Sequence, residues 1–378
     1  MKENKTKPDI RFKGFTEAWE QRKLRDEAIE ILAGGDIDKE KTVENGKYPI
    51  YANALTNDGI VGYYDDYYRV TAPAVTVTGR GEVGYAKARM THFTPVVRLL
   101  AVCSNHDCYF LENAINNHKV VVESTGVPQL TVPQLSSYNI FFPANDKEEV
   151  RIGKYFHTLD NLITLHQREC DQLKELKKSM LKKMFPRDES SIPEVRFAGF
   201  TDAWEQRKLG DVTQIIMGQS PDGSTYSEKP KDYILVQGNS DIKDGWVEPR
   251  LWTTQMTKKA DVGDLIMSVR APAGSMGKTA YNVVIGRGVA AIKGNEFIFQ
   301  SLIKKDIEGF WKKITTGSTF ESLNSNDIKN SNLLVPVNEE QIKIGQYFSQ
   351  LDNLITLHQR ELEILKNLKK TCLKRMFI

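Results

Sequence analysis

The sequence predicts an α/β (α+β) protein in which two globular domains are joined by two long, antiparallel coiled-coil helices in a pseudo-two-fold circular arrangement. Three observations lead to this prediction. Two blocks of sequence occur twice, the longer block has the periodicity of a helix, and the segments between the blocks contain strand-like runs and turn residues. The chain has 378 residues, which is enough for two hydrophobic cores.

The first repeated block is short and contains one tryptophan. IRFKGFTEAWEQRKLRD at residues 10–26 matches VRFAGFTDAWEQRKLGD at residues 195–211, an offset of 185 residues. Because tryptophan buries a large apolar surface, we expect Trp19 and Trp204 to anchor the globular domains to the helices. We assign neither residue a catalytic role.

The second repeated block predicts a long helix. Residues 153–185 match residues 345–377 at an offset of 192, and apolar side chains recur at steps of three and four along both copies. Such a stripe follows one face of a helix about 50 Å long and has to be buried, so we expect the two copies to pack together. We assign these residues to the spacer helices and to partner docking: Leu159, Leu162, His166 and Leu173 in the first copy, and Leu351, Leu354, His358 and Leu365 in the second.

The histidines of the two stripes, His166 and His358, stand at equivalent positions. A polar residue in a packed seam fixes the register of the helices, and we favour this interpretation. A pH switch or a ligand site is the alternative, because histidine titrates near neutral pH.

The repeats and the segments between them divide the chain into six parts. They are an N-terminal copy of the short block (1–24), a first globular domain (25–145), a central helix (146–187), a second copy of the short block (188–209), a second globular domain (210–337) and a C-terminal helix (338–378). The middle of the chain runs from helix to short block to globular domain. Joining the two ends would restore the same order there, which is why we expect a circular arrangement.

Composition excludes several classes of protein. No stretch has the pattern of a signal peptide or a membrane span, and four cysteines are too few for a disulfide framework, which predicts a cytoplasmic protein without membrane contact. A zinc site on Cys103, Cys108 and His106 is disfavoured because a second pair of ligands is missing. The net charge of +3 is too small to indicate nucleic acid by itself.

The sequence contains no catalytic motif that we expect to function. RAPAGSMGKT at residues 270–279 resembles a phosphate-binding P-loop, but Pro272 stands where that loop needs glycine and has no N–H to offer. There is no Asn-Pro-Pro-Tyr or Asp-Pro-Pro-Tyr motif for methylation of a base amino group, and no nuclease carboxylate cluster. We therefore predict no catalytic residue, no metal and no cofactor on this chain.

Two turn segments in each globular domain combine glycine, hydroxyl groups and polar or charged side chains. They are TVTGRGEVGYAKA (76–88) and STGVPQLTVPQL (124–135) in the first domain, and MSVRAPAGSMGKTAY (267–281) and TTGSTFESLNSNDI (315–328) in the second. Small residues let a backbone approach a polyanion, and Arg or Lys binds phosphates or guanine edges. Ordinary turns between strands are the alternative for any single residue.

The repeated blocks resemble the specificity (S) subunit of type I restriction-modification systems, in which a helix of the form YF..LDNLITLHQRELE.LK.LKK..L..MF is followed by RF.GFT.AWEQRKLG. The likeness covers essentially the whole chain. It implies a non-catalytic subunit whose two target-recognition domains bind the halves of a bipartite double-stranded DNA site, while the helices fix the gap and dock partners. The implied partners are two methyltransferase (M) and two restriction (R) subunits, which are expected to carry S-adenosylmethionine, ATP and Mg.

The resemblance also places DNA contacts in the turn segments. The residues at those positions are Thr78, Arg80, Lys87 and Gln129 in the first domain, and Ser268, Arg270, Lys278 and Ser318 in the second. Two other functions stay open: a structural coiled-coil scaffold without DNA recognition, and a self-contained DNA-modifying enzyme. The scaffold leaves two large domains without a role, and the enzyme lacks a catalytic motif.

Overall fold

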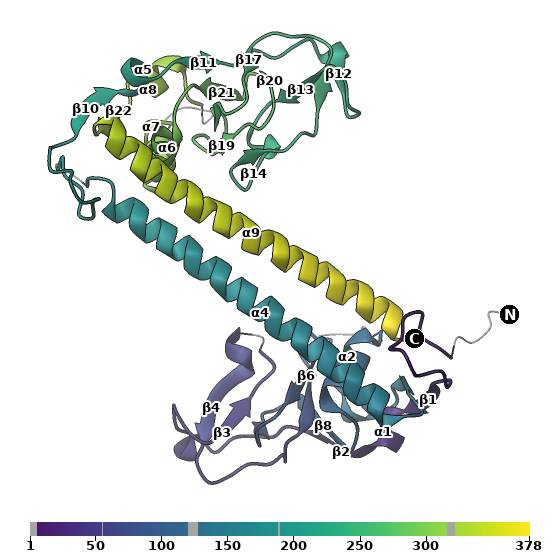
Figure 1. The fold of residues 1–378 in the computed structure, drawn as a ribbon. Helices are drawn as coiled ribbons and strands as arrows, with labels where there is room; N and C mark the ends of the chain where they lie inside the picture. Colours follow the sequence, from purple (N-terminus) through teal and green to yellow (C-terminus); the bar gives the residue numbers. More distant parts are fainter. Residues whose placement is uncertain (1–5, 55, 120–127, 188–189, 316–321) are drawn as a thin grey trace. The chain divides into compact units, whose positions relative to one another are not determined.

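The computed structural model describes residues 6–54, 56–119, 128–187, 190–315 and 322–378 (Figure 1). The chain forms two compact units, which we name unit 1 (Met1–Gln167 with Glu361–Ile378) and unit 2 (Arg168–Arg360). Each unit contains a β-rich globular domain and a segment of each of two long helices. Among the described residues, no helix combines the length and the apolar character needed to span a membrane.

The long helices are α4 (Asp146–Lys183) and α9 (Asn338–Met376), and they run antiparallel within each unit, as predicted (Figure 1). In unit 1 the start of α4 lies beside the end of α9, where the Lys369 ammonium is 2.6 Å from an Asp160 carboxylate oxygen. In unit 2 the end of α4 lies beside the start of α9, with Lys177 2.6 Å from Asp352. The two ion pairs join equivalent residues of the two copies of the repeat.

The packed face of each helix follows a repeat of seven residues. Along α9, buried or half-buried side chains recur at alternating steps of four and three residues: Leu351, Ile355, His358, Leu362, Leu365, Lys369, Cys372 and Met376. Ile163 on α4 corresponds to Ile355, whereas Leu162 and Leu354 are 38% and 44% exposed. The prediction that these two leucines lie in the packed stripe is wrong. Helices that coil around each other keep a period of about 3.5 residues, which selects the neighbouring isoleucine.

The stripe histidines contact the opposite helix within their own units. His166 Nδ1 lies 3.3 Å from a Glu361 carboxylate oxygen, and His358 Nδ1 lies 3.2 Å from Glu169. The two pairs correspond to each other in the repeat. A polar pair of this kind across a seam favours one register, in keeping with the favoured interpretation of these histidines.

In the described part of unit 1, the globular domain is built on a sheet of order β2-β8-β5-β6 and a sheet of order β4-β3-β7, while β1 pairs with β9. The strands are β1 (Glu20–Lys23), β2 (Ala28–Ala33), β3 (Tyr48–Tyr51), β4 (Ile60–Tyr64), β5 (Ala74–Thr78), β6 (Ala86–Arg89), β7 (Thr94–Pro95), β8 (Leu99–Ser104) and β9 (Asn139–Phe142). The helices are α1 (Leu24–Glu27), α2 (Cys108–Asn117), α3 (Val132–Ser136), and the 3₁₀ turns η1 (Lys39–Lys41) and η2 (Thr56–Gly59).

In the described part of unit 2, the corresponding sheets have the orders β11-β21-β18-β19-β15-β14 and β12-β16-β13-β20-β17, and β10 pairs with β22. The strands are β10 (Glu205–Lys208), β11 (Ile215–Met217), β12 (Tyr226–Ser227), β13 (Tyr233–Val236), β14 (Ile242–Lys243), β15 (Trp246–Val247), β16 (Trp252–Thr253), β17 (Lys259–Ala260), β18 (Leu265–Ser268), β19 (Met276–Lys278), β20 (Val283–Ile285), β21 (Val289–Ile292) and β22 (Asn332–Val335). The helices are α5 (Leu209–Val212), α6 (Glu296–Ile307), α7 (Phe310–Thr315), α8 (Ser325–Lys329), and the 3₁₀ turns η3 (Gly223–Thr225) and η4 (Asn239–Asp241).

The two globular domains share a strand scaffold although their sequences differ. The hairpin β5–β6 and its neighbour β8 have the same register as the hairpin β18–β19 and its neighbour β21. The matching pairs are Val75–Ala88 with Leu265–Lys278, and Thr78–Leu99 with Ser268–Val289. Every residue of β5 and β18 is buried. Strand β18 (LIMS) begins with three consecutive apolar residues, as in strands covered on both faces, whereas β5 (AVTVT) alternates valine and threonine.

Each tryptophan of the short block lies in the core at a helix end. Trp19 is 2% exposed, and its ring centre lies 5.9 Å from that of Phe110 on α2 and 6.1 Å from that of Phe377 after α9. The matching distances of Trp204 are 5.4 Å to Phe297 and 5.8 Å to Phe185. The predicted anchoring role of both tryptophans is confirmed.

The short block also closes the circle through backbone contacts. The Ile10 N–H donates to the Arg375 carbonyl at 3.0 Å, and the Val195 N–H donates to the Lys183 carbonyl at 2.9 Å. The N-terminal block therefore meets the end of α9 as the second block meets the end of α4, which agrees with the predicted circular arrangement.

A buried ion pair reinforces each of these corners. Arg11 binds Glu148 with two hydrogen bonds of 2.6 and 2.7 Å, and Arg196 binds Glu340 with bonds of 2.7 and 2.8 Å. The hydrogen bond to the carboxylate raises the pKa of each arginine, so both guanidinium groups stay charged.

Candidate nucleic-acid interface

The turns that follow β5 and β18 have the same backbone structure. The Gly84 N–H donates to the Thr78 carbonyl at 2.7 Å, and the Gly274 N–H donates to the Ser268 carbonyl at 2.8 Å. Gly274 has a φ of +103°, and a Cβ there would lie 2.5 Å from the Trp311 ring, so only glycine fits. We name these turns, residues 78–85 and 268–275, the reading turns.

The hydroxyl groups predicted to contact DNA form hydrogen bonds within the reading turns. Thr78 is 5% exposed; its Oγ1 donates to the Glu82 carbonyl and accepts the Tyr85 N–H at 3.0 Å. Ser268 is fully buried and donates to the Arg270 carbonyl at 2.9 Å. Both hydroxyls already have partners within the turn.

Arg80 and Arg270 are exposed at equivalent positions, two residues after Thr78 and Ser268. In each domain, a hydrogen bond from the later turn segment holds the backbone of the residue before the arginine. The Leu130 N–H donates to the Gly79 carbonyl at 3.0 Å, and the Leu323 N–H donates to the Val269 carbonyl at 2.9 Å. Gln129 is exposed beside Leu130. Ser318 lies outside the described residues.

A polar hollow of about 370 Å³ lies beside the reading turn of unit 2. Its lining residues are Ser220, Gln237, Gly238, Asn239, Ser268, Arg270, Ala271, Arg287 and Gly288. Arg287 is exposed, and its backbone N–H donates to Ser220 Oγ at 3.1 Å. Two guanidinium groups, amides and a hydroxyl in one hollow supply the donors and acceptors that recognise phosphates and base edges.

Sequence reasoning missed Arg287, Gln237 and Asn239. Each follows or precedes a short strand in a turn without a motif, and strand pairing rather than sequence proximity brings them beside Arg270. A weak signal exists in the polar run QGNS at residues 237–240, which follows the apolar strand β13.

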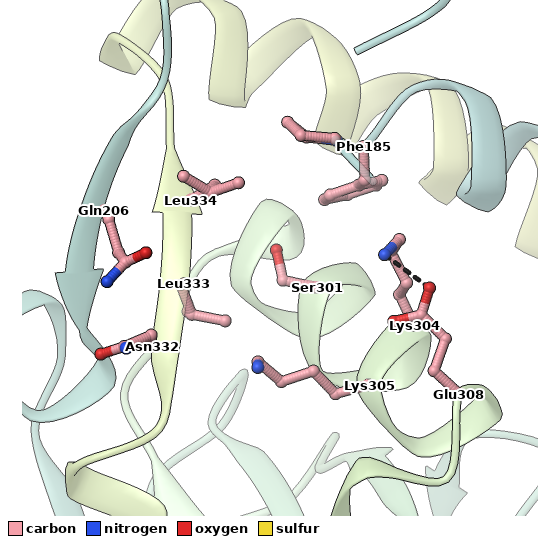
Figure 2. A pocket seen from close by; sticks show the side chains of 10 residues that line it. Phe185, Gln206, Ser301, Lys304, Lys305, Glu308, Asn332, Leu333 and Leu334 are labelled. Atoms are coloured by element: carbon pink, nitrogen blue, oxygen red, sulfur yellow. Dashed lines mark ion pairs between the residues drawn. The ribbon is translucent and has the colours of Figure 1, made fainter. Parts of the chain in front are cut away.

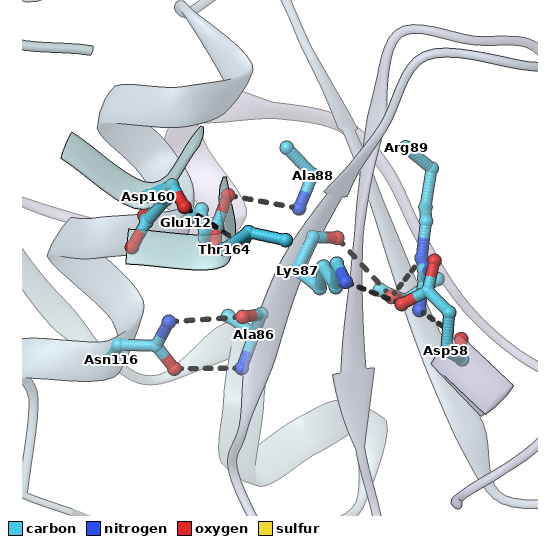
Figure 3. Close-up of polar contacts among 10 residues, drawn as sticks. Asp58, Ala86, Lys87, Ala88, Arg89, Glu112, Asn116, Asp160 and Thr164 are labelled. Carbon is cyan, nitrogen blue, oxygen red and sulfur yellow. Dashed lines mark hydrogen bonds and ion pairs between the residues drawn. The ribbon is translucent and has the colours of Figure 1, made fainter. Parts of the chain in front are cut away.

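A hollow of about 300 Å³ lies beside the reading turn of unit 1, where Thr78, Glu82 and Tyr85 line it. Arg80 is not among its lining residues, and its charge pattern differs from that of the unit 2 hollow. Asp58 contacts the ammonium of Lys87, and its Oδ2 lies 2.7 Å from Arg89 Nη1 (Figure 3). Arg89 is buried and stacks 3.7 Å from the centre of the Tyr51 ring. The cations of this hollow are therefore neutralised from within, and Lys87 has an intramolecular partner.

Lys87 and Lys278, predicted as a pair, are not equivalent. The register of the hairpins matches Lys278 with Ala88, so the two lysines point to opposite faces of their sheets. Lys278 Nζ lies 2.9 Å from Glu296 and within 5 Å of the ring centres of Trp246 and Phe299. This lysine belongs to a half-buried cluster beside α6.

A smaller hollow of about 190 Å³ lies between α6, β22 and the residues after α4 (Figure 2). The Lys305 side chain reaches into it, and burial lowers the pKa of this amine to about 8. Lys304 is paired with Glu308 at 2.6 Å. Among the residues that the structure describes, those predicted to contact DNA do not line this hollow.

The long helices expose leucines at equivalent places. Leu162 and Leu165 on α4 are 38% and 50% exposed, and Leu354 and Leu357 on α9 are 44% and 51% exposed. Neighbouring exposed leucines on a helix are typical of surfaces that bind other proteins. We name the two pairs the docking leucines.

Comparison with known proteins agrees with this structure. Residues 16–175 and 201–367 each match the type I restriction modification DNA specificity domain. The inferred type I restriction enzyme MjaX specificity subunit of Methanocaldococcus jannaschii is 26% identical over 394 aligned residues, which cover 94% of this chain and 91% of the relative.

Two solved structures share the fold. The type I restriction-modification S subunit from M. genitalium superposes with a TM-score of 0.74 at 16% identity, covering 98% of this chain and 99% of that one. A chain from a study of complex assembly and conformational transition of the type I R-M system has a TM-score of 0.52 at 21% identity, covering 96% and 98%. The chain belongs to the type I restriction-modification DNA specificity family and is a non-catalytic specificity subunit with two target-recognition domains.

Proposed function

We propose that each target-recognition domain reads one half of a bipartite double-stranded DNA site, with Arg80 and Arg270 in the two contact surfaces. One observation carries this proposal: an exposed arginine recurs at the same position of the same turn in two domains of different sequence. Guanidinium groups bind phosphates and guanine edges with two hydrogen bonds. The hollows beside the two reading turns differ in their lining charges, so we expect the two half-sites to differ in sequence.

In this proposal the helices set the number of unread base pairs between the half-sites. A helix of 38 residues, the length of α4, is about 57 Å long. The ion pairs Lys369–Asp160 and Lys177–Asp352 fix the register of the two helices in each unit, which favours one spacing.

The docking leucines are the proposed sites for two M subunits, one for each copy of the repeat. Because these side chains are 38–51% exposed, their burial in an interface would contribute roughly half of the value for a fully exposed leucine, about 1 kcal/mol each. Two R subunits would join this complex, and S-adenosylmethionine, ATP and Mg would be held by the M and R subunits. We place the complex in the cytoplasm, where its DNA substrate is found.

The test is a map of modified adenines in the host genome, made by long-read sequencing with and without this gene. We expect a motif of two short blocks separated by a fixed gap, which disappears when the gene is deleted. An unchanged map would reject the proposal.

A further inference from the structure

Strand β6 lies at the edge of its sheet, and side chains of α2 bind its free backbone groups. The Asn116 amide accepts the Ala86 N–H at 2.8 Å and donates to the Ala86 carbonyl at 2.9 Å (Figure 3). The Ala88 N–H donates to a Glu112 carboxyl oxygen at 3.2 Å. In unit 2 the corresponding strand β19 pairs with β15. Two side chains therefore cover in unit 1 an edge that a strand covers in unit 2.

Strand β6 also carries the cations of the hollow beside the first reading turn. Lys87 and Arg89 alternate with Ala86 and Ala88 along the strand, and both bind Asp58. The strand whose backbone α2 holds is therefore the strand that carries the cations of this hollow.

Glu112 is a partly buried carboxyl group surrounded by charged groups from three other elements. The charges of Asp160 on α4, Lys369 on α9 and Lys87 on β6 act on its pKa. The other titratable neighbours are Tyr85, Cys108 and Tyr109. Lys369 binds Asp160 at 2.6 Å and Lys87 binds Asp58, so both ammonium groups bind other carboxylates. Burial raises the pKa of Glu112 to about 7, and the Asp160 carboxylate adds to the increase.

In unit 2 the matching aspartate, Asp352, has a neutral hydrogen-bond donor beside it. Asp352 accepts a hydrogen bond from Gln300 Nε2 on α6 at 2.9 Å and one from Lys177 at 2.6 Å. Asp160 accepts the corresponding bond from Lys369, but its neighbour on α2 is Glu112, shown beside it in Figure 3. A carboxyl group has a hydrogen to donate only when it is protonated.

We propose that Glu112 is a positioning residue of the first target-recognition domain: in its protonated form it is the hydrogen-bond donor that joins α2, β6 and the reading turn to Asp160 of the spacer helix. Ionisation of Glu112 replaces this bond with repulsion between two carboxylates. Recognition by the first domain then weakens as the pH rises through neutrality, while recognition by the second domain does not. This consequence for DNA rests on the proposed function of the domain.

The linkage between protonation and stability has a definite sign. The folded pKa of Glu112, about 7, lies above the ordinary value of 4.5, so between these values the folded chain holds a proton that the unfolded chain has released. The stabilisation is complete below the unfolded pKa and is lost as the pH rises through the folded pKa. Glu112→Gln keeps a neutral donor and removes this loss.

The first experiment needs no DNA. The full chain and its Glu112→Gln variant are unfolded by denaturant from about pH 5 to about pH 8. We expect the ratio of their unfolding constants, wild type over variant, to rise by up to about tenfold for each pH unit and to level off above about pH 7. Infrared spectra should show a protonated carboxyl band at slightly acidic pH in the wild type that the variant lacks. Superimposable stability profiles would overturn the proposal.

Two further variants separate positioning from space filling. Gln300→Glu is the matched change in unit 2 and should introduce a similar loss of stability at high pH. Glu112→Ala removes the donor at every pH, so its discrimination of the first half-site should be weaker than that of Glu112→Gln. Equal behaviour of the alanine and glutamine variants would reject a positioning role.

The last experiment measures DNA binding by the complex with M subunits, using the sequence found in the methylation map. We expect the wild type to lose discrimination of the first half-site between mildly acidic and mildly alkaline pH, and Glu112→Gln to keep it. If the stability and infrared effects are found but discrimination of the first half-site does not change with pH, the coupling of Glu112 to DNA recognition is rejected. Failure to find any bipartite site rejects the proposed function instead.

Discussion

Arg270 and Arg287 place two exposed guanidinium groups at one hollow of the second recognition domain. Their backbones lie on the turns at the ends of β18 and β20, which the strands hold in place. Binding residues lie disproportionately on loops that a rigid scaffold holds in place.

Replacement of Arg270 or Arg287 by Ala should weaken binding of the second half-site. If the guanidinium reads a guanine, its removal should cost about 1–3 kcal/mol of binding free energy and relax specificity at one base pair. If it binds a phosphate, its removal should weaken binding to all sequences and lower the salt dependence of binding. Titration of the complex with DNA variants at several salt concentrations distinguishes these outcomes. Arg207→Ala, an exposed arginine on β10, is the control. Variants that bind like this control would contradict the assignment.

Loss of Arg11 should destabilise the chain strongly. The Glu148 side chain is 1% exposed, so Arg11→Ala leaves a buried carboxylate without its cation and costs about 3–5 kcal/mol. The double variant with Glu148→Gln should recover much of this loss, as denaturant unfolding will show. Arg25 pairs with Asp26 at the surface, and its replacement by Ala should cost less than about 1 kcal/mol. Similar costs for Arg11 and Arg25 would argue against the buried corner.

At the scale of elements, each long helix has one face packed on the opposite helix and one face with exposed leucines. Leu159 is 5% exposed and belongs to the core, while Leu162, three residues later, is 38% exposed. The separation follows from the coiling of the helices, which turns neighbouring positions of the repeat in different directions.

Changing Leu162 and Leu165 to Ser should weaken binding of one M subunit by about 1 kcal/mol for each leucine without unfolding the chain. Native mass spectrometry should then show complexes with a single M subunit, and the same change at Leu354 and Leu357 should affect the other copy. Leu159→Ala is the contrast, because it should cost about 2–5 kcal/mol of folding stability. Retention of both M subunits by the serine variants would show that docking takes place elsewhere.

At the scale of the molecule, each unit is a recognition domain closed by one short block and two helix segments. The contacts Ile10–Arg375 and Val195–Lys183 make the two closures alike. Because each globular domain has its own core within its unit, the two domains should read DNA independently.

Exchange of residues 25–145 for another domain of the same layout should therefore change one half-site and leave the other half-site and the gap intact. A methylation map of the hybrid checks this outcome. Folding of the hybrid is judged by its assembly with M subunits. A change in both half-sites, in a hybrid that assembles, would mean that the domains do not read separately.

The site was predictable from sequence only in part. Arg80 and Arg270 could be singled out because in both domains an arginine follows a strand-like run and stands beside small residues of a turn. The sequence comparison of Lys278 with Lys87 was misleading, because a shift of one residue in strand register moves a side chain to the opposite face of the hairpin. Arg287 was missed because only strand pairing brings it near Arg270. Ile163 was missed because one helical position separates a seam residue from an exposed one.

The sequence by itself determined the duplicated plan: two long helices, two recognition domains, and two tryptophan corners that close a circle. A repeat is visible in sequence because each copy has to bury the same stripe against its counterpart. The tertiary structure alone decided which side chains are available to a ligand. Exposure depends on register, on strand pairing and on partners such as Asp58 and Asp160, and these contacts join residues that are far apart along the chain.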